Sequence, residues 1–263
     1  MDRGRNPPIF FSQNLINVLG GTMKKTVYTL NIDNYAPEIT ELTYPLLKHY
    51  AKKIDADFQI ITERKYPDFP PVYEKLQIHE LGKNNDWNIY IDSDALVHPD
   101  MFDVTEFIHK DTVCHNGNDM ANNRWRYDNY FRRDGRHIGS CNWFTIASDW
   151  CIDLWHPLEI PFEEAVQNIF PIQKEINTVI TPDHLIDDYT LSRNIAKFGL
   201  KFTTVLQIMK NFDDVSSSYF WHLYTVTIDQ KVNGWEEEKD GIMTHNAGMK
   251  DMIKLWGVEK LIG

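Results

Sequence analysis

The chain has 263 residues, of which 42% are hydrophobic and 25% are charged, and its formal net charge at pH 7 is −11. The length allows one large α/β domain or two small ones, and the composition is that of a folded globular protein. The negative charge argues against general binding of nucleic acid or of anionic membranes, because phosphate groups are bound by Lys and Arg.

The cysteines Cys114, Cys141 and Cys151 are odd in number and show no C-x-x-C spacing. They favour a reducing compartment over a disulfide framework or a cysteine zinc site. No apolar run approaches the length of a membrane span. These features predict a cytoplasmic protein without a membrane span.

Residues 1–22 are expected to form a leader extension, and the folded domain would begin at Met23. From there the apolar pattern predicts strands and helices in alternation, with parallel strands joined by right-handed crossovers. We expect a strand at 26–30, a helix at 37–54 with a kink at Pro45, a strand at 58–62, a short helix at 72–81 and a strand at 87–91.

The last of these strands ends in two carboxylates. Residues 87–91 are mainly aromatic or β-branched, and Asp92, Ser93 and Asp94 follow them directly. Ligands of open α/β sheets usually bind at the carboxyl ends of the strands. Two carboxylates this close repel each other unless a cation lies between them, and Mg²⁺ or Mn²⁺ prefers such oxygens. Taken alone, the motif could equally be an ordinary acidic turn.

The second half of the chain is less regular. Residues 111–137 are polar and rich in arginine and aromatic residues, which predicts a long loop that contacts a sugar or phosphate, or else a solvated surface loop. Asp187 and Asp188 lead into a helix expected at 189–198 and capped by Gly199. Taken alone, the two would be a helix N-cap and an acid in its first turn. Further strands are expected at 139–146 and 202–206, and a helix from 149.

In order and spacing, these signals resemble a GT-A glycosyltransferase, in which a D-x-D motif at a strand end binds Mn²⁺ or Mg²⁺ on a nucleotide diphosphate sugar. The motif here is Asp92-Ser93-Asp94. The resemblance implies an α/β, GT-A (Rossmann-like) fold: a mixed, mostly parallel sheet flanked by helices in a single domain, 23–263. Its nucleotide-sugar half would cover about 23–100 and its acceptor and catalytic half about 101–263. Asp94 would bind the metal, and Asp92 the ribose or the metal.

The chain is most similar to the retaining galactosyl, mannosyl and xyloglucan xylosyl transferases, and more loosely to glycogenin. The xylosyltransferases carry a terminal H-x-x-G-x-K, and His245, Gly248 and Lys250 occur here at that spacing. The resemblance implies that His245 completes the metal site and that Lys250 reaches the diphosphate. A neutral imidazole suits Mn²⁺ as a third ligand, and an ammonium group balances phosphate charge.

Thr29-Leu30-Asn31 with Tyr35 is similar to the uridine loop of glycogenin, which favours UDP over GDP. Tyr35 would stack on the base, a contact worth roughly 1–3 kcal/mol. Packing of Tyr35 on the core is the alternative. Lys75 stands where relatives keep a basic residue for the donor, and a solvated lysine is the alternative.

Asp187 and Asp188 form the expected catalytic pair, and two mechanisms stay open. Retaining xylosyltransferases have Asp-Asp-Gln at this point, and in this chain Tyr189 replaces the Gln. In a retaining mechanism the Asp pair would stabilise an oxocarbenium-like centre and bind the acceptor. Inverting GT-A enzymes have E-D-x-x-L, which Asp188 and Leu191 match, and Asp187 would be the general base. The motif at His245 favours retention.

The sequence thus predicts a metal-dependent enzyme that moves a hexose or pentose from a nucleotide diphosphate sugar, with UDP favoured, to a hydroxyl acceptor on a glycan, a protein or a small molecule. Phosphatases of the haloacid dehalogenase type also use D-x-D, but normally after the first strand, whereas two β-α units come first here. A non-catalytic module that binds sugar nucleotides is the third class.

Overall fold

The structure is a computed structural model that describes residues 23–116, 143–169, 182–209, 219–221 and 241–262. At 168–169, 182–185, 221 and 241–247, only the backbone is described. The expected leader at 1–22, Cys141 and most of the loop predicted at 111–137 therefore lie outside the described residues. The same holds for the side chain of His245.

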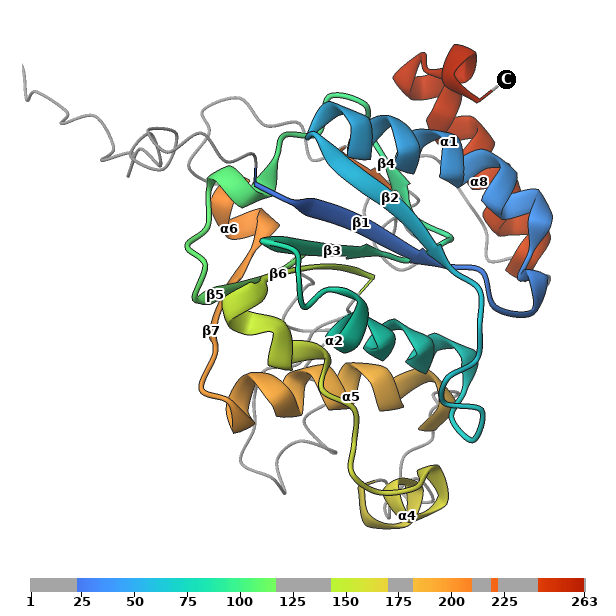
Figure 1. Ribbon diagram of the computed structural model, residues 1–263. Helices are drawn as coiled ribbons and strands as arrows, with labels where there is room; N and C mark the ends of the chain where they lie inside the picture. The colour runs from blue at the N-terminus through green and yellow to red at the C-terminus, as the bar shows by residue number, and fades with distance from the viewer. Residues whose placement is uncertain (1–22, 117–142, 170–181, 210–218, 222–240, 263) are drawn as a thin grey trace, which may run out of the picture.

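A six-stranded sheet runs through the molecule with helices on both faces, as Figure 1 shows. The strands are β1 (Lys25–Leu30), β2 (Ala56–Ile61), β3 (Trp87–Ile91), β5 (Thr112–His115), β6 (Phe144–Ser148) and β7 (Lys201–Thr204), with β4 (Leu96–Val97) and β8 (Phe220–Trp221) in a separate pair. The helices are η2 (Ile32–Asn34), α1 (Pro37–Lys53), η3 (Pro71–Gln77), α2 (Ile78–Leu81), η4 (Val104–Glu106), η6 (Asp149–Trp155), α4 (Phe162–Ile169), α5 (Pro182–Lys197), α6 (Val205–Met209), α8 (Gly241–Trp256) and η7 (Glu259–Leu261).

The strand order is β2-β1-β3-β6-β5-β7. β1 pairs in parallel with β2 and β3, β5 pairs in parallel with β7, and β6 is antiparallel to both of its neighbours. The predicted α/β class with a mixed, mostly parallel sheet flanked by helices is therefore confirmed. Because β6 runs opposite to the other five strands, the carboxyl ends of those five meet at one edge of the sheet.

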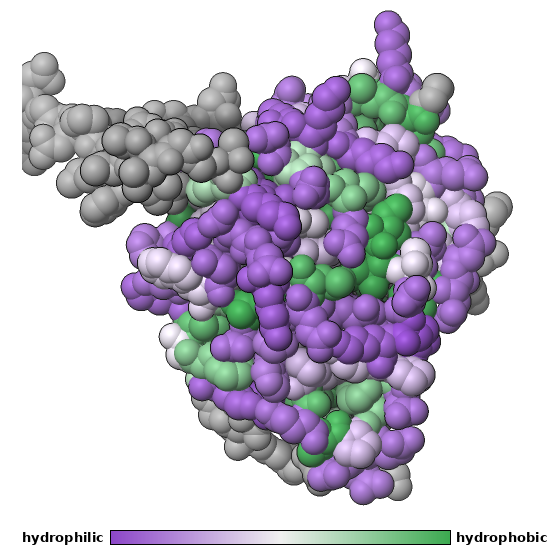
Figure 2. All heavy atoms as spheres, viewed as in Figure 1, coloured by the Kyte–Doolittle hydropathy of each residue, from purple (hydrophilic) through white to green (hydrophobic). Residues whose placement is uncertain are grey.

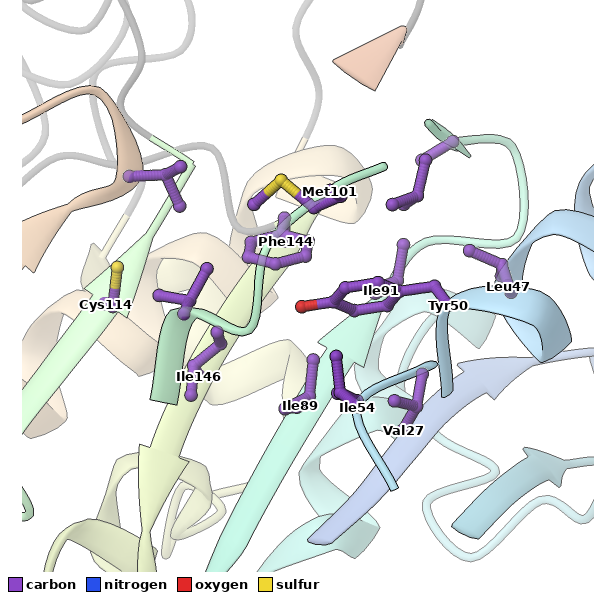
Figure 3. Packing of buried hydrophobic residues seen from close by; sticks show 14 of the residues in the cluster. Val27, Leu47, Tyr50, Ile54, Ile89, Ile91, Met101, Cys114, Phe144 and Ile146 are labelled. Carbon is purple, nitrogen blue, oxygen red and sulfur yellow. The ribbon is translucent and has the colours of Figure 1, made fainter. Parts of the chain in front are cut away.

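Helix α1 covers one face of the sheet. Its buried positions recur at helical spacing, and Leu47 and Tyr50 meet Val27, Ile89 and Ile91 from the strands, as Figure 3 shows. The helix is one element from Pro37 to Lys53, so the proline expected to kink it lies inside a continuous helix.

The opposite face is covered by η3, α2, η6 and α5, which lie below the sheet in Figure 1. Tyr28, Tyr90 and Val113 project from the strands into this second core, where Leu191 and Ile195 of α5 meet them. α5 ends as predicted, because Gly199 follows it at φ +63°, a conformation that favours glycine.

Helix α8 lies beside α1 at the outside of the molecule (Figure 1). Its residues Met249 and Ile253 pack with Ile39 and Leu46 of α1 and with Leu96 of β4. The C-terminal helix is therefore anchored close to the turn that joins β3 to β4.

Several predicted elements differ from the structure. The strand predicted at 202–206 ends at Thr204, where α6 begins, and the strand predicted at 139–146 extends to Ser148. Strand β5 lies inside the stretch predicted as a long loop, because the short run Thr112-Val113-Cys114 is a strand buried between β6 and β7. Helix α5 begins at Pro182, seven positions before the predicted helix start. Proline is favourable in a first helical turn. Asp187 and Asp188 therefore lie inside the helix, and their interpretation as an N-cap is wrong.

The face shown in Figure 2 is mainly hydrophilic, with apolar residues in separate patches. Among the described residues, no helix combines the length and the apolar character needed to cross a bilayer. The described cysteines, Cys114 and Cys151, are buried free thiols.

Candidate functional site

The D-x-D motif lies at the carboxyl edge of the sheet, in a turn directly after β3. The backbone amide of Asp92 donates to the carbonyl of Trp143 at 2.8 Å, and that of Ala95 donates to the carbonyl of Asp92 at 3.1 Å. The hydroxyl of Thr43 in α1 donates to the carbonyl of Ser93 at 2.6 Å. These bonds hold the turn against both the sheet and α1, and Asp92 and Asp94 remain partly exposed.

Lys75 joins this turn to helix α5. Its ammonium group lies 3.3 Å from Oδ1 of Asp92 and 2.7 Å from Oδ2 of Asp187, and the residue is only 2% exposed. Sequence reasoning left open a solvated lysine, and that alternative is wrong. The structure brings together three predicted site residues, and we call them the Lys75 cluster.

The aromatic ring of Tyr90 completes the surroundings of the Lys75 cluster. The ring centroid lies 4.6 Å from the Lys75 ammonium, and the Tyr90 hydroxyl donates to Oδ1 of Asp92 at 2.5 Å. Burial and the negative charge of Asp92 raise the pKa of Tyr90 well above its ordinary value, so the phenol stays protonated and can donate. Sequence reasoning identified Tyr90 only as a strand residue.

The charge of Lys75 is set by two opposing effects. Burial lowers the pKa of the ammonium, but the carboxylates of Asp187 and Asp92 outweigh burial, and the pKa lies well above its ordinary value. Lys75 is therefore a cation at neutral pH. Asp187 and Asp188 are both buried on α5, and Asp187 is the one that contacts the ammonium.

The predicted nucleotide loop lies at the same edge, after β1. Oγ1 of Thr29 and Oδ1 of Asn31 are buried and have no hydrogen-bond partner within the described part of the chain, whereas the carbonyl of Leu30 accepts from the hydroxyl of Tyr44 at 3.0 Å. Buried polar atoms of this kind usually bind water or a ligand. Tyr35 is 46% exposed, so the alternative that it packs in the core is wrong.

The proposed contribution of α8 stays a prediction. The side chain of His245 lies outside those described, and Lys250 is exposed on the helix. Among the described residues, no group of three or more His, Cys, Asp or Glu side chains is arranged to hold a metal. Met249, one turn after position 245, packs with Leu96, which follows Asp94 by two positions.

His115, at the end of β5, was missed because its strand was predicted as a loop. Its imidazole is fully buried, and Nδ1 lies 3.0 Å from Oγ1 of Thr145 on β6. Burial and the positive charge of Lys75 lower the pKa of His115 to about 3, so the ring is neutral at physiological pH. The run Thr112-Val113-Cys114-His115 is too short, and has no apolar-polar alternation, to stand out as a strand in the sequence.

The lowered pKa of His115 gives a pH prediction. Between about pH 6.5 and 3 the unfolded chain binds a proton at this residue and the folded chain does not, so the free energy of unfolding falls as pH falls. This one group should remove roughly 3 kcal/mol between pH 6.5 and pH 4. Urea unfolding of the wild type and His115→Gln at several pH values measures it. Equal pH slopes for the two proteins would contradict the prediction.

Comparison of the sequence with models of known protein families gave no match, and comparison with curated proteins gave none either. Comparison of the structure with solved structures gave many matches of low sequence identity.

A glycosyltransferase involved in glycosylation of the major capsid of PBCV-1 has a TM-score of 0.44 at 11% identity, over 86% of this chain and 98% of that one. The galactosyltransferase LgtC, in complex with donor and acceptor sugar analogues, has a TM-score of 0.44 at 12% identity, over 88% of this chain and 95% of that one. A Drosophila β1,4-galactosyltransferase 7 mutant in complex with manganese, UDP-Gal and xylobiose has a TM-score of 0.40 at 11% identity, over 84% of this chain and 79% of that one. Because these TM-scores are below 0.5, the function proposed below rests on the residues of this chain.

Proposed function

We propose that the protein is a GT-A glycosyltransferase that moves a hexose or pentose from a nucleotide diphosphate sugar to a hydroxyl acceptor, with Mn²⁺ or Mg²⁺ as cofactor and UDP as the favoured nucleotide. The observation that carries the proposal is the Lys75 cluster. It connects the D-x-D turn after β3 with the Asp-Asp pair of α5, at the edge of the sheet where α/β proteins bind ligands.

The donor set fits a hard divalent cation. Asp92 and Asp94 present two carboxylates from one partly exposed turn, and Lys75 joins Asp92 to the carboxylate of Asp187 on α5. Carboxylate oxygens are the ligands that Mg²⁺ and Mn²⁺ prefer. We propose Asp94 and Asp92 as metal ligands, with His245 as the third and Lys250 on the diphosphate. When bound, the metal would neutralise the charge that develops on the departing diphosphate.

The residues of the cluster then have separate tasks. Tyr90 and Lys75 both contact Oδ1 of Asp92, so they orient its carboxylate. Lys75 also holds Asp187 in α5 by the 2.7 Å contact. Because one oxygen of Asp187 already accepts from Lys75, we favour electrostatic stabilisation of an oxocarbenium-like centre by the Asp pair, hence retention, over general-base catalysis by Asp187.

The segment after β1 would bind the nucleoside. The unpartnered oxygens of Thr29 and Asn31 are suitable acceptors for hydrogen bonds from a uracil base or from ribose, and the exposed ring of Tyr35 can stack on the base. The carbonyl of Leu30 accepts from Tyr44, which holds the end of β1 in place.

The decisive experiment is a panel of UDP- and GDP-sugars with Mn²⁺, scored for release of the nucleotide and for the anomeric form of the product. Water can serve as the acceptor. Release of UDP from one sugar nucleotide supports the proposal. Release of phosphate from a simple phosphoester, without turnover of any sugar nucleotide, would support a phosphatase instead. Binding of UDP with no turnover would support a non-catalytic module.

Metal-bridged binding makes a second, independent prediction. UDP at a hundredfold excess over its Kd should raise the Tm by roughly 5–10 °C, and only when Mn²⁺ or Mg²⁺ is present. Asp94→Ala should abolish this shift, because the carboxylate would bind the cation that bridges to the diphosphate. Asp57→Ala on the exposed side of β2 is a matched control and should keep the shift. An undiminished shift in Asp94→Ala would rule out the metal bridge.

A further inference from the structure

Nε2 of His115 is a buried hydrogen-bonding atom with no partner among the residues that the structure describes. The other ring nitrogen, Nδ1, is held by Thr145, and the ring of Phe202 packs at 5.1 Å between centroids. A buried polar atom left unpaired destabilises the folded state, so such atoms in folded proteins usually mark a bound water, ion or ligand.

The sheet register places His115 in the same row as the Lys75 cluster. Tyr90 on β3 pairs with Thr145 on β6, and Thr145 pairs with His115 on β5. Paired residues of neighbouring strands project from the same face, which here is the face covered by η3 and α5. With strands about 4.8 Å apart, His115 lies about 10 Å from Tyr90 across the sheet. The charge of Lys75 still acts on the imidazole.

The chemistry of the ring selects the kind of ligand. If the Thr145 hydroxyl donates to Nδ1, Nε2 carries a proton and donates; if Thr145 accepts from Nδ1, Nε2 is an acceptor. A hydroxyl group satisfies either tautomer, because it both donates and accepts. A neutral ring offers no charge to a phosphate, which disfavours the diphosphate as its partner.

We propose that Nε2 of His115 hydrogen-bonds a sugar hydroxyl of the substrate, which makes His115 a specificity-determining residue of the site. This rests on the function proposed above. The hydroxyl belongs either to the sugar of the donor or to the acceptor, and both present the same chemistry to the ring. Thr145 acts through His115 as a positioning residue, because it fixes the orientation of the ring.

The test uses His115→Phe, which keeps an aromatic ring and removes both nitrogens, and His115→Gln, which keeps a polar group. His109→Phe is the matched control, because His109 is 69% exposed and lies outside the site. Nucleotide release is measured with the UDP-sugar that the wild type turns over, first in water alone and then with methyl glycosides as acceptors. The Tm without ligand and its shift with UDP and Mn²⁺ are measured for each variant.

We expect His115→Phe to lower kcat/KM by about 5- to 30-fold, the loss of one or two hydrogen bonds. His115→Gln should recover part of it, and Thr145→Val should fall between His115→Phe and the wild type. The increase in Tm on adding UDP and Mn²⁺ should be the same in His115→Phe as in the wild type, since His115 contacts the sugar and not the nucleotide. A loss of kcat/KM that is already present with water as the acceptor assigns the hydroxyl to the donor sugar. A loss of kcat/KM that appears only with methyl glycosides assigns it to the acceptor.

Unchanged kcat and KM of His115→Phe in both reactions would overturn the role of His115 and leave the glycosyltransferase proposal standing. If His115→Phe lost the increase in Tm with UDP and Mn²⁺ together with its activity, the role of His115 would be overturned too, because the residue would then be structural. A wild type that releases no nucleotide from any sugar nucleotide would instead overturn the proposed function, and the role of His115 with it.

Discussion

Replacing Lys75 with methionine should lower nucleotide release by about 10²–10³-fold, because one substitution removes the cation that orients both Asp92 and Asp187. The same change should destabilise the protein by about 3–5 kcal/mol, the usual cost of removing one partner from a buried ion pair. Lys75 is only 2% exposed, so water cannot replace the ammonium without a rearrangement of the turn. Nucleotide release and urea unfolding measure the two effects.

Stability and activity can be separated in this experiment. The double variant Lys75→Met/Asp187→Asn no longer buries the Asp187 carboxylate without its partner, so it should regain stability while nucleotide release stays low. Lys197→Met is a matched control: Lys197 also pairs with a carboxylate, Glu159, but is half-exposed on the last turn of α5. An exposed pair of that kind contributes about 1 kcal/mol or less. Full activity of Lys75→Met would contradict the role of the cluster.

Asp187→Asn and Asp188→Asn should each reduce transfer by about 10²–10³-fold while they keep the metal-dependent Tm shift with UDP. Both residues are buried on α5, the helix that faces the sheet. The D-x-D turn that would bind the metal lies outside this helix, so these variants should leave it intact. An amide has nearly the shape of a carboxylate but lacks its charge, so these variants test charge stabilisation directly. Nucleotide release and thermal shift are measured on the same protein samples.

The anomeric configuration of the product separates the two mechanisms. Retention, with loss of activity in both variants, supports the Asp pair as an electrostatic group. Inversion, with the larger loss in Asp187→Asn, would support Asp187 as the general base. Asp153→Asn in η6 is a control, because Asp153 is half-exposed and its carboxylate contacts His79, away from the Lys75 cluster. Full transfer by either variant would exclude that residue from catalysis.

Local patterns in the sequence were enough for much of the fold. Apolar residues at helical spacing over 37–54 and β-branched or aromatic residues at 87–91 predicted α1 and β3, because an amphipathic helix and a doubly buried strand each carry their burial pattern in a short window. The alternation of these elements predicted parallel strands and a common carboxyl edge. It placed Asp92 and Asp94 at that edge.

Only the tertiary structure decided what the charged residues do there. No local pattern distinguishes a solvated lysine from Lys75, whose burial is possible because two carboxylates distant in sequence, one from the turn after β3 and one from α5, converge on its ammonium. His115 was hidden for the same reason: four residues of β5 become a strand only because β6 and β7 provide hydrogen bonds on both sides. The sequence alone determined which chemical groups reach the carboxyl edge of the sheet, and long-range packing determined which of them meet.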